Sequence, residues 1–202
     1  DLFGLGIAIF YFLIISKSYE WICKVNRKEQ IVFLCYTCIS VLILEEIITL
    51  VYSDSFALSK FLFPLVVYLY LRKLKKYEKY KGIFISLLLS LLYHSTHTFI
   101  SVTLSSIMGD GLVLQYKSIF FLVVLLLTYF IIIKISRYFH LEITYFDKDY
   151  LYPFLKKVIV AFFGLHILLF FSDIVSTIHH LNSFGSILST IVFICLLLIF
   201  FA

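Results

Sequence analysis

Long apolar runs separated by short polar segments are the dominant pattern of the chain from Leu2 to Ala202. A helix needs about 20 apolar residues to cross the hydrocarbon core of a bilayer, and shorter runs can span when flanking Lys or aromatic side chains reach the interface. Seven runs meet this criterion, at residues 2–16, 31–52, 59–71, 83–107, 118–136, 157–178 and 184–202. The pattern predicts an all-α, polytopic membrane helix bundle with seven transmembrane helices.

The clusters of Lys and Arg between these runs predict the orientation of the chain. The segments around the ends of the first, third and fifth runs hold fifteen of the 17 basic residues, and the two others are Lys60 and Lys117. Because basic loops are retained in the cytoplasm, we expect the N-terminus outside, the C-terminus cytoplasmic and the protein in the plasma membrane. Only an odd number of spans gives this result, which supports counting the short run 59–71 with its Pro64.

The composition argues against a soluble protein and against a nucleic-acid partner. Hydrophobic residues make up 62% of the chain and charged residues 14%, with a formal net charge of +5. This composition lies far outside the soluble range, and the basic clusters are where a membrane protein carries its topology signals. The four cysteines are predicted on the reducing side, so we expect no disulfide. We interpret Cys35 and Cys38 as small hydrophobes rather than as a redox or metal motif.

Two adjacent acids interrupt the second run, in the segment VLILEEIITL of residues 41–50. The predicted orientation places Glu45 and Glu46 in the outer half of that helix, where each charge costs about 1–3 kcal/mol. Neighbouring positions on a helix lie about 100° apart, so the two side chains cannot point the same way. We expect one glutamate to face a binding pocket and the other to bond to a neighbouring helix.

The fourth and sixth runs carry polar side chains at helical spacing. One stripe along the fourth run consists of Ser86, Ser90, His94, His97, Ser101 and Ser105. One face of the sixth run holds His166, Asp173 and Thr177. Such faces turn toward the interior of a membrane bundle, and small serines also permit close helix contact. We expect His94 and His97 to orient the pocket from below.

Three classes of function suit acids and histidines inside a membrane. A metal-dependent intramembrane protease would use Glu45/Glu46 and His94/His97, but the Arg of an EExxxR motif and the Glu of HExxH are absent. A transporter would show helices broken by Gly or Pro in paired positions near the midplane, and neither proline is so placed. A sensor for an external ligand needs an outward pocket and a last helix entering the cytoplasm, and the predicted topology supplies both. The outward side is also net acidic and would attract a soluble cation.

Five long and irregular stretches of the chain resemble one family of membrane receptors. They are FLFPL, SLLLSLLYHSTH, MGDGLVLQY, YFDKDYLYPFLKKV and VSTIHHLNSFGSILSTIVF. Together they are similar to the membrane-sensor half of the streptococcal competence-stimulating-peptide receptor, the ComD-type histidine kinase, a relative of the staphylococcal AgrC receptors. The likeness runs over nearly all of the 202 residues, and it is more specific than any short motif.

This resemblance implies a receptor in quorum sensing. Residues 1–202 would form its transmembrane peptide-sensor domain, and a cytoplasmic histidine kinase is expected after residue 202. The implied ligand is a cationic, amphipathic, linear peptide pheromone, and the implied partners are a second copy of the chain in a homodimer, the lipid bilayer and a response regulator. The kinase would use ATP and Mg, whereas within residues 1–202 we expect no enzyme activity, no cofactor and no metal.

The residues expected to bind the peptide lie toward the outer end of the predicted bundle. For attraction of basic groups we select Glu45, Glu46, Asp54, Asp110 and Asp173. For contact with the apolar face of a helical peptide we select Phe56, Phe61 and Phe63. Binding is expected to favour one packing of the bundle and to shift the seventh helix.

Overall fold

The computed structural model describes residues 2–51, 55–138, 152–179, 191 and 194 of the chain. Within these residues the regular elements are helices and no strand occurs. They are α1 (Leu2–Cys23), α2 (Arg27–Val51), α3 (Ser55–Lys73), α4 (Lys79–Met108), α5 (Asp110–Gln115), α6 (Lys117–Tyr138) and α7 (Tyr152–His179). The predicted all-α class is confirmed over this part of the chain.

The six long helices coincide with the first six predicted spans, and the short α5 lies in the predicted outer loop between the fourth and fifth. The predicted span 184–202 lies outside the described residues. Among the described residues, four helical segments are long and apolar enough to cross a bilayer: Arg27–Ile48, Lys79–Met108, Lys117–Arg137 and Pro153–Phe171. These segments support a polytopic membrane protein, while the number of spans and the orientation of the termini stay predictions.

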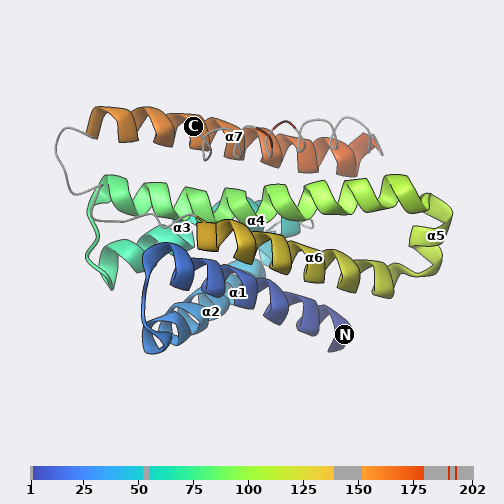
Figure 1. Cartoon of the computed structure of the whole chain (residues 1–202), viewed down its shortest axis with the longest axis horizontal. Coiled ribbons are helices and arrows are strands. Elements are labelled where there is room, and N and C mark those ends of the chain that lie inside the picture. The colour runs from blue at the N-terminus through green and yellow to red at the C-terminus, as the bar shows by residue number, and fades with distance from the viewer. Residues whose placement is uncertain (1, 52–54, 139–151, 180–190, 192–193, 195–202) are drawn as a thin grey trace.

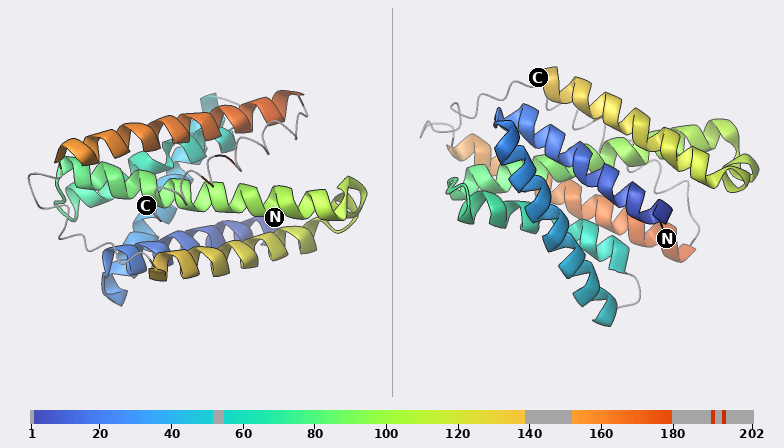
Figure 2. Two further views of the ribbon diagram at one scale, coloured as in Figure 1. Left: turned by 45° about the horizontal axis from the view of Figure 1, so that its top comes forward. Right: turned by 90° about the horizontal axis from the view of Figure 1, so that it is seen from below.

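Helix α4 is the centre of the bundle. It contacts α7, α3, α6 and α1, and α2 packs against α3 and α1. Figure 1 shows α7, α4 and α6 running along the long axis, with α5 closing the α4–α6 hairpin at one end. Figure 2 shows α2 crossing the other helices at a steep angle. A helix enclosed in this way is buried around its whole circumference, as α4 is from Phe84 to Tyr93. Ser86 and Ser90 of the predicted stripe are buried, and so is the opposite face.

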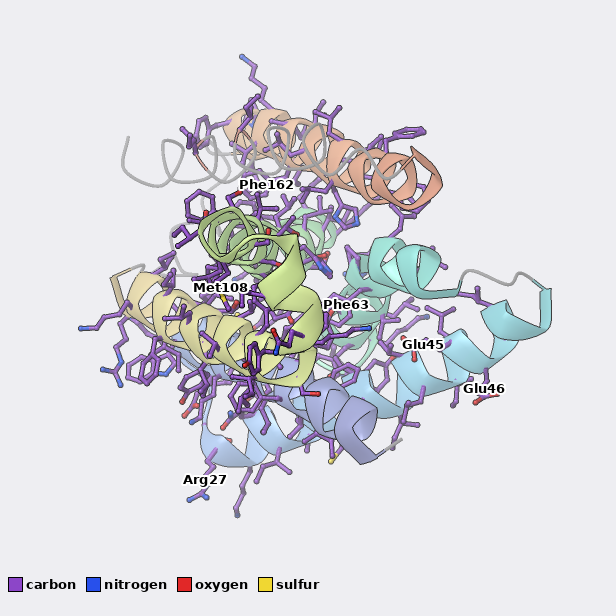
Figure 3. All side chains as sticks on the ribbon, turned by 90° about the vertical axis from the view of Figure 1, so that its right-hand side faces the viewer. Arg27, Glu45, Glu46, Phe63, Met108 and Phe162 are labelled. Carbon is purple, nitrogen blue, oxygen red and sulfur yellow. The ribbon has the colours of Figure 1, made fainter. Side chains whose placement is uncertain are left out.

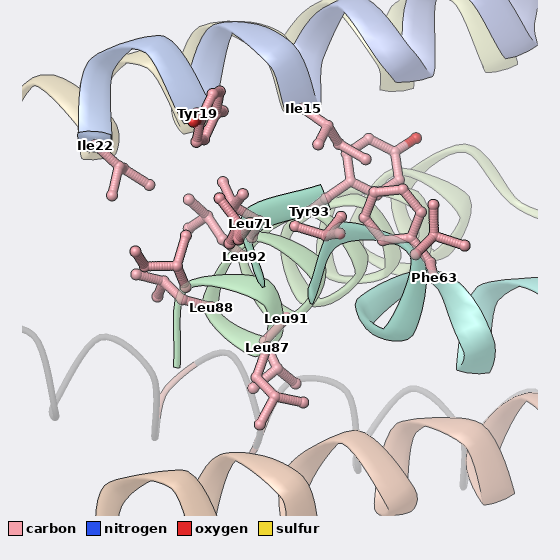
Figure 4. Packing of buried hydrophobic residues seen from close by; sticks show 14 of the residues in the cluster. Ile15, Tyr19, Ile22, Phe63, Leu71, Leu87, Leu88, Leu91, Leu92 and Tyr93 are labelled. Atoms are coloured by element: carbon pink, nitrogen blue, oxygen red, sulfur yellow. The ribbon is translucent and has the colours of Figure 1, made fainter. Parts of the chain in front are cut away.

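The main hydrophobic core joins α1, α3 and α4 (Figure 4). Ile15 and Tyr19 of α1, Leu71 of α3, and Leu88 and Leu91 of α4 are almost completely buried. Because lipid tails are as apolar as these side chains, close packing and dispersion hold this core together more than removal from water does. Along this stretch the three helices therefore form one tightly packed unit.

One end of the bundle, opposite α5, is fastened by polar contacts. Lys75 of the α3–α4 loop forms an ion pair with Glu29 of α2, and the Tyr19 hydroxyl of α1 donates to the same carboxylate at 3.2 Å. In the same loop, burial raises the pKa of Tyr77 to about 12, and the nearby Cys23 and Glu29 add to the rise. These contacts tie α1, α2 and the α3–α4 loop together. The basic clusters at 24–28 and 72–81 lie at this end, which we call the inner end.

Candidate functional site

The adjacent glutamates of α2 lie in different environments. Glu45 is half-buried and points toward the bundle, whereas Glu46 is exposed and points away from it (Figure 3). The Glu45 carboxylate lies near Tyr11 of α1. The two side chains diverge as the sequence predicted, and Glu45 is the inward one. The expectation that the other glutamate bonds to a neighbouring helix does not hold, because Glu46 lies on the outward surface of α2.

Tyr11 lies among rings from two other helices. It meets Tyr93 of α4 edge-on with 4.4 Å between ring centroids, and Phe63 of α3 at 5.7 Å. The imidazole of His94 lies 6.2 Å from the same ring. Edge-to-face pairs of this kind fix the orientation of their rings. We call Tyr11, Glu45, Phe63, Tyr93 and His94 the outer cluster.

Of the two histidines of α4, His94 belongs to the outer cluster, and His97 adjoins it three residues further along the helix. His94 is half-buried, and its ring centroid lies 5.3 Å from that of Tyr93. His97 stacks on Tyr93 at 5.6 Å and extends the arrangement toward α5. The structure therefore brings the predicted His94 and His97 to the same group of rings that Glu45 faces.

Two of the three phenylalanines expected to contact a peptide pack within the bundle. Phe63 is only 1% exposed, so its ring supports the outer cluster from inside the bundle. Phe61 is half-buried, and its ring lies 5.4 Å from that of His166 and 4.6 Å from that of Phe170, both in α7. Phe61 therefore joins α3 to α7, and its contact with a peptide stays a prediction.

The remaining predicted site residues lie at the limits of the described structure. For Phe56 in α3, Asp110 in α5 and Asp173 in α7, the structure describes the backbone alone. Asp54 lies outside the described residues. Three parts of the backbone lie toward the end of the bundle opposite the inner end: the start of α3, the whole of α5 and the last turns of α7 (Figure 1). The backbone positions of Asp110 and Asp173 thus lie toward the end of the bundle opposite the inner end.

The described residues contain no group of three or more His, Cys, Asp or Glu side chains placed to hold a metal ion. A protease using both glutamates and both histidines would need Glu46 on the same side as Glu45, and the structure turns it away. What the outer cluster does offer is one carboxylate beside aromatic rings and imidazoles. This combination stabilises a positively charged group through Coulomb attraction and cation–π contact.

Tyr11 is the member of the outer cluster that the sequence did not reveal. It stands within the apolar run IAIFYFLII of residues 7–15, where one tyrosine resembles any lipid-facing aromatic residue. Tyr93 could have been found, because it directly precedes the histidines in YHSTH and so shares their turn of helix. Only the packing of α1 on α4 shows that the two tyrosines meet.

Comparison with known proteins returned no relative: no family model, no curated protein and no solved structure matches the chain.

Proposed function

We propose that this protein is a membrane receptor domain that binds an extracellular cationic peptide, of the ComD type that its sequence resembles. The observation that carries the proposal is the contrast between Glu45 and Glu46. An acid within a membrane bundle is costly and usually functional. Glu45 points toward the bundle and lies near Tyr11, although its neighbour shows that α2 can also direct a carboxylate outward.

The outer cluster has the chemistry to receive one basic side chain. A carboxylate accepts short, charge-assisted hydrogen bonds from an ammonium or guanidinium group. The faces of Tyr11 and Tyr93 add cation–π attraction of about 0.5–2 kcal/mol. Because Lys and Arg have long apolar stems, the charge can reach inward while the apolar face of the peptide stays at the helix ends.

The outer acids have a separate role in this proposal. Asp54, Asp110 and Asp173 form a negative approach surface that raises the rate of encounter with a cationic peptide. Glu45 then holds one basic group in place. Acids are also common in the outer loops of membrane proteins that bind no peptide. The proposal therefore rests on Glu45 more than on these three aspartates.

The proposal extends to the cytoplasmic side through the family resemblance. A bound peptide favours one packing of a homodimeric bundle, and a cytoplasmic histidine kinase using ATP and Mg passes phosphate to a response regulator. None of the six histidines in these 202 residues is proposed as the phosphorylated one.

The test compares two neighbouring substitutions in the same helix. The protein is reconstituted in nanodiscs and titrated into fluorescent synthetic competence-stimulating peptides, with empty nanodiscs as the blank. Glu45→Gln removes one charge-assisted contact, which we expect to contribute about 1.4 kcal/mol. It should therefore raise Kd about tenfold. Glu46→Gln is the matched control and should leave Kd within about twofold. Equal losses in both variants, or no loss in either, would reject the proposal.

A further inference from the structure

Helix α7 is joined to α3 by a hydrogen bond from a buried histidine. His166 is 4% exposed, and its Nε2 lies 3.0 Å from the backbone carbonyl oxygen of Phe61. Since a carbonyl oxygen only accepts, Nε2 carries the hydrogen. Both the Nε2–H tautomer and the imidazolium can donate, so this contact does not require His166 to be charged.

The acceptor lies where the backbone of α3 is altered by a proline. Pro64 stands inside α3 and has no amide hydrogen, so the carbonyl of Lys60 loses its partner in the helical ladder. The proline ring also crowds the carbonyl of Lys60, which directly precedes Phe61. Away from water, a polar side chain of a neighbouring helix is the natural partner for carbonyl groups at such a place. His166 donates to the next carbonyl along the chain, that of Phe61, on the α7 side of α3.

The side chain of Phe61 is held by α7 as well. Its ring is nearly parallel to the His166 imidazole, with 17° between the planes and 5.4 Å between centroids. The ring of Phe170, one turn further along α7, also packs on the Phe61 ring, with 4.6 Å between the ring centroids. One residue of α3 thus meets α7 through both its carbonyl and its ring.

We propose that His166 is the positioning residue that couples the outer half of α3 to α7. This inference rests on the proposed receptor function. Phe61 is two positions before Phe63, which packs against Tyr11 in the outer cluster. A ligand that repacks the outer cluster therefore displaces this part of α3, and the bond and the ring stack carry the displacement to His166. Because packed helices switch between discrete arrangements, α7 moves as one body.

The test measures the distance between α3 and α7 directly. Spin labels are placed at two exposed positions, through Leu65→Cys and Phe163→Cys, in a background where Cys23, Cys35, Cys38 and Cys195 are replaced by Ala. His166→Phe keeps a ring on Phe61 but has no donor. Because the variant loses one hydrogen bond, we expect the population of longer α3–α7 distances to increase about two- to tenfold.

A second variant separates the bond from the bulk of the side chain. His166→Gln carries an amide N–H at nearly the reach of the imidazole Nε2, and it should restore the parent distance distribution. His166→Leu also lacks a donor, so it should increase the population of longer distances as His166→Phe does, and it keeps the test decisive if His166→Phe does not fold.

The same labelled proteins are then titrated with synthetic competence-stimulating peptides. In the parent, binding should change the α3–α7 distance, whereas in His166→Phe the peptide should still bind and leave that distance unchanged. Failure of the parent to bind any peptide rejects the receptor proposal, and the ligand-free distances still test the contact. If His166→Phe gives the parent distances with and without peptide, the coupling role of His166 is wrong.

Discussion

The inner and outer ends of the bundle contain similar chemical groups with different neighbours. At the inner end, Glu29 of α2 holds the Lys75 ammonium and the Tyr19 hydroxyl. Other cations of the chain lie over rings nearby: Arg137 is 4.7 Å from the Trp21 ring centroid. At the outer cluster, a second glutamate of α2 lies near Tyr11 instead. At the inner end the carboxylate, the rings and the cations all belong to the chain, and we propose that a ligand adds a cation at the outer cluster.

Glu29→Gln should give the largest effect on stability and none on ligand binding. The change removes the charge that holds Lys75, and the two side chains are only 20% and 27% exposed. We expect the free energy of unfolding to fall by about 1–3 kcal/mol, because the remaining ammonium is poorly solvated there. Thermal unfolding of the protein in detergent, followed by circular dichroism, measures this change.

The matched control for that experiment is Lys76→Met. Lys76 neighbours Lys75 in the same loop but is exposed. Its loss should alter stability by less than about 0.5 kcal/mol. A stability loss as large as that of Glu29→Gln would mean that general charge in the loop, rather than the Glu29–Lys75 pair, fastens the inner end.

Substitutions of Tyr11 should have a smaller effect and should act on binding. Tyr11→Leu removes the ring that faces Glu45, and we expect peptide Kd to rise about fivefold, the value of one exposed cation–π contact. Tyr11→Phe keeps the ring and should change Kd by no more than about twofold. Peptide titration in nanodiscs compares the two. If Tyr11→Phe weakens binding as much as Tyr11→Leu, the hydroxyl is the recognition element and the cation–π interpretation is wrong.

The helices were predictable because their signal is strong and local. Each apolar run in the described part is long enough that alternative elements do not fit, and the first six predicted spans coincide with α1, α2, α3, α4, α6 and α7. The enclosure of α4 was only partly predictable. Its serine and histidine stripe indicated an inward face, but its leucines gave no sign of whether they meet lipid or other helices.

The outer cluster was predictable in its residue types but not in its geometry. Glu45 and Glu46 are adjacent and identical in chemistry, so only the positions of α1 and α3 beside α2 decide which one is inward. The contact between His166 and Phe61 joins residues 105 positions apart, and no local pattern encodes such a contact. Sequence periodicity predicts which face of a helix is polar, whereas the partner of that face follows from tertiary packing.

The most direct test of the account is a double-mutant cycle between Glu45 and the basic residues of a bound peptide. Kd is measured for the parent and Glu45→Gln proteins, each with the parent peptide and with peptides in which one Lys or Arg is replaced by Gln. If Glu45 receives a basic side chain of the peptide, one basic position should show a coupling free energy with Glu45 of about 1–2 kcal/mol. At the other basic positions, the effects of the two substitutions on the binding free energy should be additive. Additivity at every basic position would contradict the claim that Glu45 receives a cation from the ligand.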